Sequence, residues 1–397
     1  MRILHLSTLY PPHVVGGAEK SVALLAEAQV AHGHTVAAAC ISPTGAPKTN
    51  RNGVTVYRMP HENEFWMEDW PKHPMPQRVW SKFRQQFNLK IEAHFQDIID
   101  DFKPDVINTH SLVDISTLVW RAAYRRNVPV VHTLRDYDLV CSSSSMFRNG
   151  RQCEHRHLKC KALTFTKAHN QKWVSAVAAV GGEILNRHVE MGFFEHLPPE
   201  RRQVIWNAAV VEGDDVSRAN REGKPFVFGY LGRISIDKGV GTLLEALKAL
   251  PNGDWNVLLA GKPAESLEPF EAMATGLPVT FAGFMDPKAF FDAIDVLIVP
   301  SIWAEPLPRT VLESYFMGVP AIGARSGGIP DLIADDDWLY APGDSQELAA
   351  RMQQVIAAGR QALPGRGSFD RVLKETSPEI VCARYVGLYE KAIDAKL

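Results

Sequence analysis

The sequence has few cysteines, no long apolar run and almost no net charge, and each absence excludes a class of protein. Five cysteines in 397 residues, an odd and thinly spread number, do not make a disulfide framework. No stretch approaches the roughly 18 to 20 apolar residues of a membrane span, and the N-terminus lacks the apolar core of a signal peptide. A formal charge of −2 gives no reason to expect a nucleic-acid partner. We therefore expect a cytoplasmic protein.

Short apolar segments alternate with amphipathic ones, which predicts two parallel-sheet domains with helices on both faces. A chain of 397 residues is too long for one ordinary core. Strands are expected at 2–7, 35–41, 55–59, 106–109, 128–133, 176–180, 226–231, 256–260, 279–282 and 296–300. Helices are expected at 20–31, 79–102, 116–126, 240–250 and 287–293, and a polar linker at about 207–224.

Two glutamates follow the strand expected at 296–300. A helix should run from about Pro308 to Met317, since proline suits a first helical position and Gly318 suits the stop. Glu305 would then lie on the loop after the strand, and Glu313 about two turns further on, inside the helix. Open α/β sheets bind ligands at this end of their strands.

Two further loops join an expected strand to an expected helix. Gly16 and Gly17 would let the backbone approach an anion at the start of the first helix, although a plain strand-to-helix turn fits the spacing equally well. Gly232 opens the second loop, where Arg233 and Lys238 could hold phosphate oxygens. The alternative for the second loop is a pair of solvated surface cations.

Four segments, in this order along nearly the full length, resemble motifs of family 4 of the retaining glycosyltransferases, which use nucleotide-sugar donors. The segment at 16–19 reads G-G-A-E, as in the N-terminal loop of that family, and His110 matches a histidine that ends a strand. Residues 232–239 resemble its G-R-x-x-x-x-K-G motif. Glu305 and Glu313 resemble its E-x7-E signature.

The resemblance implies a GT-B fold, with two Rossmann-like parallel-sheet domains facing a central cleft. Residues 1–207 would bind the acceptor, residues 208–376 would bind the nucleotide sugar, and residues 377–397 would form a helix that crosses back to the first domain. Ser377 suits the cap of that helix and Pro378 its first position.

The implied activity is metal-independent transfer of a hexosyl group, with retention of configuration, from a UDP- or GDP-sugar. No cofactor is expected, because the nucleotide sugar is a substrate. The acceptor would be a hydroxyl of a glycan, a lipid-linked molecule or a small molecule, in polysaccharide or glycoconjugate biosynthesis. Peripheral contact with the inner face of the membrane is an open alternative.

The resemblance also assigns site residues. His110, Glu305, Arg233 and Lys238 are the expected catalytic group, with Glu313 on the ribose. The residues expected to bind the donor are Gly16, Gly17, Gly232, Arg233, Lys238, Leu307, Arg309, Thr310 and Glu313. Leu307, Arg309 and Thr310 are included for their amides, because Pro308 replaces a common glycine.

The chain departs from the family pattern at three other places. Asp331 follows Gly327 and Gly328 where relatives carry glutamate, which argues against a direct ligand contact from Asp331. Arg135 precedes Asp136 where histidine is commoner, so Asp136 could simply cap a turn. The domain junction reads Asn207-Ala208-Ala209-Val210 instead of N-G-V-D.

Several alternatives remain open at this point. A non-catalytic partner subunit, a sugar-nucleotide epimerase or a phosphorylase could share the fold. Cys141, Cys153 and Cys160, with His155 and His157, could bind zinc, although a flexible basic loop fits their spacing better. Trp80, Phe83, Phe87 and Ile91 recur at helical spacing, which predicts a core-facing stripe, with membrane docking as the alternative.

Overall fold

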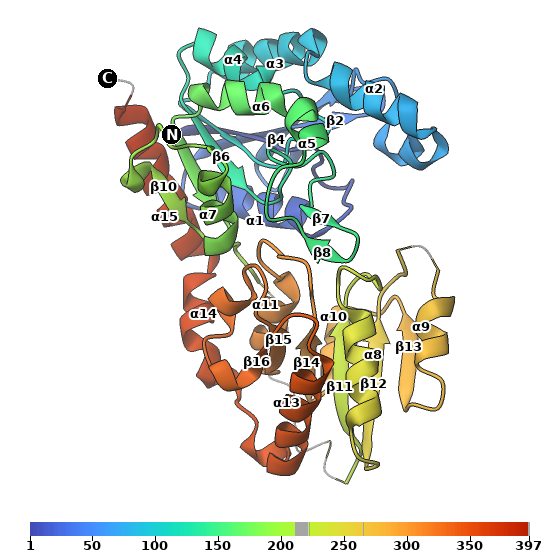
Figure 1. Ribbon diagram of the computed structural model, residues 1–397. Helices are drawn as coiled ribbons and strands as arrows, with labels where there is room; N and C mark the ends of the chain where they lie inside the picture. The colour runs from blue at the N-terminus through green and yellow to red at the C-terminus, as the bar shows by residue number, and fades with distance from the viewer. Residues whose placement is uncertain (211–220, 222, 265, 396–397) are drawn as a thin grey trace. The chain divides into compact units, whose positions relative to one another are not determined.

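The computed structural model describes residues 1–210, 221, 223–264 and 266–395, and these fall into two compact units (Figure 1). Unit 1 comprises Met1–Met146, Cys153–Ala208 and Pro378–Leu397, and unit 2 comprises Phe147–Gln152 and Ala209–Ser377. Most of the expected linker at 207–224 lies outside the described residues.

Unit 1 is built on an eight-stranded sheet in the order β10-β9-β6-β5-β1-β2-β4-β3. The strands are β1 (Arg2–Leu6), β2 (Thr35–Ser42), β3 (Ala46–Arg51), β4 (Val54–Pro60), β5 (Val106–Thr109), β6 (Val130–Leu134), β9 (Ala176–Ala179) and β10 (Arg202–Val204). All neighbours pair in parallel except β3, which pairs antiparallel with β4 at the edge. The parallel strands β1, β5, β6 and β9 are almost wholly buried because helices cover both faces of the sheet.

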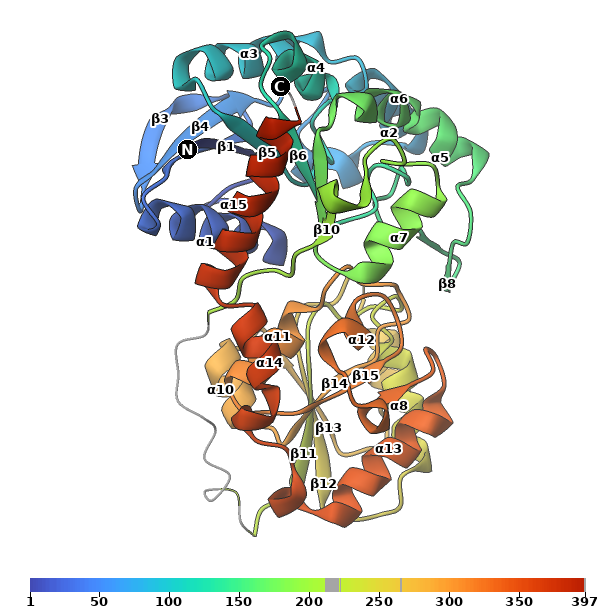
Figure 2. The same ribbon diagram turned by 90° about the vertical axis from the view of Figure 1, so that its left-hand side faces the viewer.

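The helices of unit 1 form two layers about its sheet (Figure 2). The C-terminal helix α15 (Pro378–Asp394) packs beside α1 (Gly17–Ala31), and its Tyr385 and Leu388 join a core with Ile3 of β1. On the opposite face α3 (Leu89–Phe102) packs against α4 (Leu118–Arg125). The remaining helices are α2 (Met75–Gln85), α5 (Leu158–Leu163), α6 (Phe165–Asn170) and α7 (Gly182–Glu190).

Unit 2 contains a six-stranded, wholly parallel sheet in the order β13-β12-β11-β14-β15-β16. The strands are β11 (Phe226–Leu231), β12 (Trp255–Ala260), β13 (Val279–Gly283), β14 (Val296–Val299), β15 (Ala321–Ala324) and β16 (Leu339–Tyr340). The helices are α8 (Val240–Ala249), α9 (Glu268–Met273), α10 (Pro287–Asp292), α11 (Arg309–Phe316), α12 (Ile329–Leu332), α13 (Ser345–Ala358) and α14 (Asp370–Glu375). A short hairpin, β7 (Phe147–Arg148) and β8 (Arg151–Gln152), groups with this unit, and Gln152 Oε1 accepts from Ala304 N at 3.1 Å.

Both sheets reverse their strand order at one point. Numbered from β11, the order in unit 2 is 3-2-1-4-5-6, and the reversal falls between β11 and β14. Numbered from β1 and without the β3 hairpin strand, unit 1 has the order 3-2-1-4-5-6-7, in which β10 adds a seventh strand, and its reversal falls between β1 and β5. Doubly wound sheets bind their ligands at the carboxyl ends of the two strands that flank such a switch point. We therefore expect the site residues at the carboxyl ends of β11 and β14 in unit 2 and of β1 and β5 in unit 1.

The expected strands are present, while one expected helix is wrong. The helix expected at 79–102 is two helices, α2 and α3, because Asn88 interrupts it and accepts a hydrogen bond from Ile91 N at 3.2 Å, which starts α3. Strand β3, with the polar sequence A-P-K-T-N-R and all six residues exposed, has no apolar alternation and was not expected. None of the described helices combines the length and apolar composition needed to cross a membrane.

Candidate active site

The loops that follow β11 and β14 lie side by side at the switch point of unit 2. Ile302 N and Trp303 N both donate to Asp237 O, at 3.1 and 3.0 Å. Lys238 Nζ lies 2.8 Å from Glu305 Oε1, and these two side chains are 20% and 13% exposed. Lys238 also stands 5.0 Å above the centre of the Trp303 ring. The structure thus brings together two of the four expected catalytic residues.

Arg233 lies on the same loop but is oriented by other contacts. Its guanidinium is 55% exposed and pairs with Asp237, four residues along the loop, at 2.7 Å. Its backbone oxygen accepts from Tyr230 Oη at 2.6 Å. Burial, with smaller effects of Glu305 and Asp237, raises the pKa of Tyr230 well above its usual value, so this phenol stays a donor. Arg233 therefore offers a positioned, solvent-facing cation beside Lys238.

Two glycines allow the loops of unit 2 to approach this closely. Gly239, which caps α8, has φ 71°, and a Cβ there would lie 1.7 Å from Pro300 O at the end of β14. Gly327 has φ 58°, and a Cβ there would lie 2.1 Å from Glu305 O. Gly328 N donates to the same oxygen at 2.7 Å. Gly327 and Gly328 thus fix the backbone of Glu305, which explains the glycine pair in the sequence.

Helix α11 begins one residue later than expected, with Pro308 as its N-cap and Gly318 (φ 70°) after its end. Glu313 lies inside the helix, is 21% exposed, and its carboxylate is 3.5 Å from the guanidinium of Arg309. The first turn of a helix leaves amides without intrahelical acceptors, and such amides favour anions. Leu307 and Thr310 flank this start, where a phosphate contact was expected.

His110 occupies the corresponding edge of unit 1, directly after β5, and is fully buried. Its Nδ1 accepts from Arg135 Nε at 3.1 Å, and its Nε2 lies 2.9 Å from His5 Nδ1. His5 Nε2 in turn lies 2.7 Å from Gln29 Oε1. Because Gln29 Oε1 can only accept, His5 carries its proton on Nε2 and donates it to Gln29. His5 Nδ1 is then an acceptor, so His110 also carries its proton on Nε2 and donates it to His5. Both nitrogens of His110 are thus engaged.

Burial keeps these histidines neutral. It lowers the pKa of His5 to about 4 and the pKa of His110 well below its usual value, and the Arg135 charge lowers both further. Arg135 also donates to Asn207 Oδ1, at the departure from N-G-V-D. The arginine that replaces the commoner histidine therefore ties the junction to His110. Sequence reasoning had left its role open.

The G-G-A-E segment starts α1. Gly17 is the first helical residue, and Gly16 precedes it with extended backbone (φ −149°). Gly16 N donates to Glu19 Oε2 at 3.0 Å, so the glutamate caps the helix. A Cβ on Gly16 would meet nothing closer than that carboxylate oxygen, at 3.9 Å. The fold itself therefore does not require glycine at position 16.

A buried polar network follows β5 and β6 in unit 1. Asp136 accepts from Ser111 Oγ at 2.5 Å and from Asp138 N at 2.8 Å, and Asp138 pairs with the buried Lys167 at 2.5 Å. Asp136 thus caps a turn, one of the expectations from sequence. Burial, and then the Asp138 charge, raises the pKa of Asp136 to about 6. Lys167 was not singled out, because its helix gives a lone lysine no distinguishing pattern.

The cysteine segment does not gather ligands for a metal. Among the described residues no group of three or more His, Cys, Asp or Glu side chains is arranged to hold an ion. Cys153 Sγ is 3.7 Å from His157 Nε2, whereas Cys160 Sγ contacts Ser142 Oγ at 3.6 Å. The cysteine segment, which was expected to be a flexible basic loop, instead contains the β7–β8 hairpin and helix α5.

Unit 2 is a Rossmann-like unit, a doubly wound sheet with a lysine–carboxylate pair, an exposed arginine and a helix start at its switch point. Comparison with known proteins identifies its family. Residues 213–363 match the family described as "Glycosyl transferases group 1", and residues 16–208 match the "Glycosyl transferase 4-like domain". The chain belongs to these family 4-type glycosyltransferases.

Individual proteins are similar to this chain over part or most of its length. An uncharacterized 42.6 kDa protein in the cps region of Klebsiella pneumoniae is 29% identical over 353 residues, which cover 88% of this chain and 91% of that protein. The lipopolysaccharide core biosynthesis glycosyltransferase LpsE of Rhizobium meliloti is 30% identical over 167 residues, 40% of this chain and 48% of LpsE. The crystal structure of Anabaena Alr3699/HepE with UDP-glucose matches 97% of this chain and 98% of its own, with a TM-score of 0.68 at 17% identity. The expected GT-B fold of two Rossmann-like domains is confirmed.

Proposed function

We propose that the protein is a retaining, metal-independent hexosyltransferase that moves a sugar from a UDP- or GDP-sugar to a hydroxyl acceptor in polysaccharide or glycoconjugate biosynthesis. The observation that carries the proposal is the Lys238–Glu305 pair at the switch point of unit 2, beside Arg233. The match to Alr3699/HepE, solved with UDP-glucose, supports the donor class. The match to LpsE supports the pathway.

Unit 2 would bind the donor. Arg233 suits the diphosphate because its exposed guanidinium can grip two oxygens in fork geometry, and Lys238 adds a point charge. The diphosphate gains negative charge as the glycosidic bond breaks, so fixed cations there lower the barrier. Amides at the start of α11, at Leu307, Arg309 and Thr310, would add contacts to the phosphates, and Glu313 would bind the ribose.

Glu305 would hold the transferred sugar, close to the cation that stabilises the leaving group. The bond between the acceptor oxygen and the anomeric carbon forms on the face from which the diphosphate departs, which retains the configuration. The departing phosphate oxygen takes the acceptor proton. In this scheme His110 contacts the sugar only after Arg135 or His5 releases one of its nitrogens, because both nitrogens are engaged.

The test is turnover of a panel of UDP- and GDP-sugars, followed by NMR with and without added acceptors. The proposal predicts release of nucleoside diphosphate from one donor class, and a product with the donor's anomeric configuration. Conversion of the donor into a different nucleotide sugar would indicate an epimerase. Nucleotide binding without release or conversion would indicate a non-catalytic partner subunit, and either result would overturn the proposal.

A further inference from the structure

Helix α2 of unit 1 presents apolar side chains on two faces, and neither face is buried in a core. Trp80, Phe83 and Phe87 were expected to pack inward with Ile91, but only Ile91 is buried. Trp80, Phe83 and Phe87 are 56%, 40% and 47% exposed. Their rings form a row, with centroids 6.0 Å apart from Trp80 to Phe83 and 5.6 Å apart from Phe83 to Phe87. The expectation of a core stripe was wrong for these three residues.

The other face of α2 lines a cavity of about 510 Å³. Met75, Arg78, Val79 and Lys82 stand at positions i, i+3, i+4 and i+7 and so lie along one side of the helix. The apolar wall of the cavity is formed by Met67, Trp70, Pro71, Met75, Val79 and Leu163. The polar wall is formed by Ser142, Ser143 and Ser144 with three cations.

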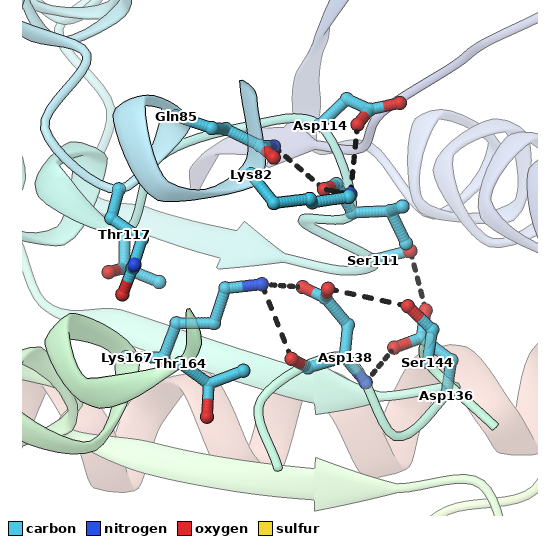
Figure 3. Close-up of polar contacts among 12 residues, drawn as sticks. Lys82, Gln85, Ser111, Asp114, Thr117, Asp136, Asp138, Ser144, Thr164 and Lys167 are labelled. Atoms are coloured by element: carbon cyan, nitrogen blue, oxygen red, sulfur yellow. Dashed lines mark hydrogen bonds and ion pairs between the residues drawn. The ribbon is translucent and has the colours of Figure 1, made fainter. Parts of the chain in front are cut away.

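The lining of the cavity contains more cationic side chains than carboxylates. Lys82 Nζ donates to Asp114 Oδ1 at 3.2 Å and to Val113 O at 3.0 Å (Figure 3). Among the described residues, Arg78 donates only to the backbone oxygens of His73, at 2.6 Å, and Pro71, at 2.8 Å. Lys159 is exposed and makes no ion pair with any described residue. Three cations against the single carboxylate of Asp114 leave an excess of two positive charges for an anion.

The inner end of the cavity is polar but electrically balanced. Lys82, Ser142 and Leu163 also border a small inner space closed by Asp138 and Lys167. These two pair at 2.5 Å, and Lys167 Nζ also donates to Asp138 O at 3.3 Å (Figure 3). The uncompensated charge therefore lies near Arg78 and Lys159, next to the apolar wall.

We propose that this cavity binds the acceptor, and that the acceptor is a phosphate-bearing lipid. The apolar wall would bury the first part of its chain, and the excess cations would hold its phosphate. The exposed aromatic row, formed by Trp80 and Phe83 of α2 and by Phe87 just after it, suits a lipid surface from which such a molecule would enter. This inference rests on the proposed function, since it names the acceptor class.

The test is titration calorimetry with hexyl phosphate, inorganic phosphate and hexanol. Both walls contribute to the site, so hexyl phosphate should bind at least about tenfold more tightly than either half alone. Equal binding of inorganic phosphate would point to a phosphate without a lipid. Equal binding of hexanol would leave no role for the cations, and no binding of any probe would exclude the site; each of these results overturns the inference.

Matched variants locate the binding. Lys159→Glu should weaken hexyl phosphate by about tenfold or more, whereas Lys161→Glu, on the same helix α5 but outside the cavity, should not. Val79→Trp should fill the cavity and abolish binding, with thermal melting used to check that the variant is folded. Nucleotide binding should be unchanged in all three variants. If nucleotide binds but Lys159→Glu does not weaken the binding of hexyl phosphate, the acceptor assignment is overturned while the proposed transferase function stands. If nucleotide does not bind the wild type, the result counts against the proposed function itself.

Discussion

Lys238 Nζ lies 2.8 Å from Glu305 Oε1, although the two residues are contributed by separate loops after β11 and β14. The parallel order of the sheet places both loops at one edge, and the contacts of Asp237 O with Ile302 N and Trp303 N hold them together. The pair keeps a largely buried lysine compensated before a phosphate arrives. A bound diphosphate would compete with Glu305 for this cation.

Removal of either partner should therefore reduce catalysis in a non-additive way. Lys238→Met should lower kcat by about 10² to 10³, because a fixed cation near the leaving group is lost. Glu305→Gln should also lower kcat, and the double variant should be less impaired than the product of the two single effects. Steady-state kinetics on the three variants measures this, and strictly multiplicative effects would argue against a functional pair.

Gly327 should be far less tolerant of substitution than Gly367, a second glycine of unit 2. Gly327→Ala places a methyl group against Glu305 O in a left-handed backbone conformation, so it should destabilise unit 2 by about 2 kcal/mol or more and displace Glu305. Gly367→Ala is the control, because a Cβ there meets nothing within 4 Å and its φ is not positive. Urea unfolding compares them, and equal stabilities would contradict the steric account.

Gly16 should show the opposite behaviour. An added methyl group has space, so Gly16→Ala should change the free energy of unfolding by no more than about 1 kcal/mol. If the segment approaches the donor phosphates, the same variant should raise KM for the nucleotide sugar several-fold. Unchanged kinetics would assign Gly16 to a plain strand-to-helix turn.

Stability should fall as pH is lowered from about 6.5 to about 4. Burial lowers the pKa of His5 and His188 to about 4 and of His132 to about 3, so the unfolded chain binds more protons than the folded one throughout this window. Asp136 has the opposite effect, because its pKa in the folded chain is raised to about 6. Between its unfolded pKa near 4 and about 6, the folded chain holds one more proton at Asp136 than the unfolded chain. The histidines outnumber it, so the net sign is destabilisation by acid.

Urea unfolding at a series of pH values measures this dependence. A stability curve that is flat across the window would contradict neutral, buried histidines in the fold. His132→Gln should reduce the slope by about one proton.

The sequence predicted the parts of the structure that depend on local pattern. Apolar runs placed β5 and β11 at their observed bounds, and the proline and glycine around Glu313 placed α11 within one residue. It did not predict the break at Asn88, because the amphipathic period continues through the residues that follow. The exposure of Trp80, Phe83 and Phe87 was also missed, since helical spacing alone does not say which face finds a partner.

The partners of the site residues could not be predicted either, because they depend on contacts between segments far apart in the chain. His110 was assigned from its place at a strand end, but its contacts with Arg135 and His5 span 25 and 105 residues. The Asp138–Lys167 pair spans 29 residues, and neither side chain belongs to a recognisable motif. The expected roles of the site residues in binding and catalysis stay predictions.

The most direct test of nucleotide-sugar binding at the switch point is calorimetric titration of UDP, GDP and ADP into wild type, Arg233→Ala and Lys288→Ala. Arg233 and Lys288 are both 55% exposed and both paired with an aspartate four residues along the chain, so Lys288→Ala controls for loss of a surface cation. We predict that UDP or GDP binds wild type and Lys288→Ala equally, and Arg233→Ala at least about tenfold more weakly. Equal binding to all three proteins, or no binding of any nucleotide, would contradict the account.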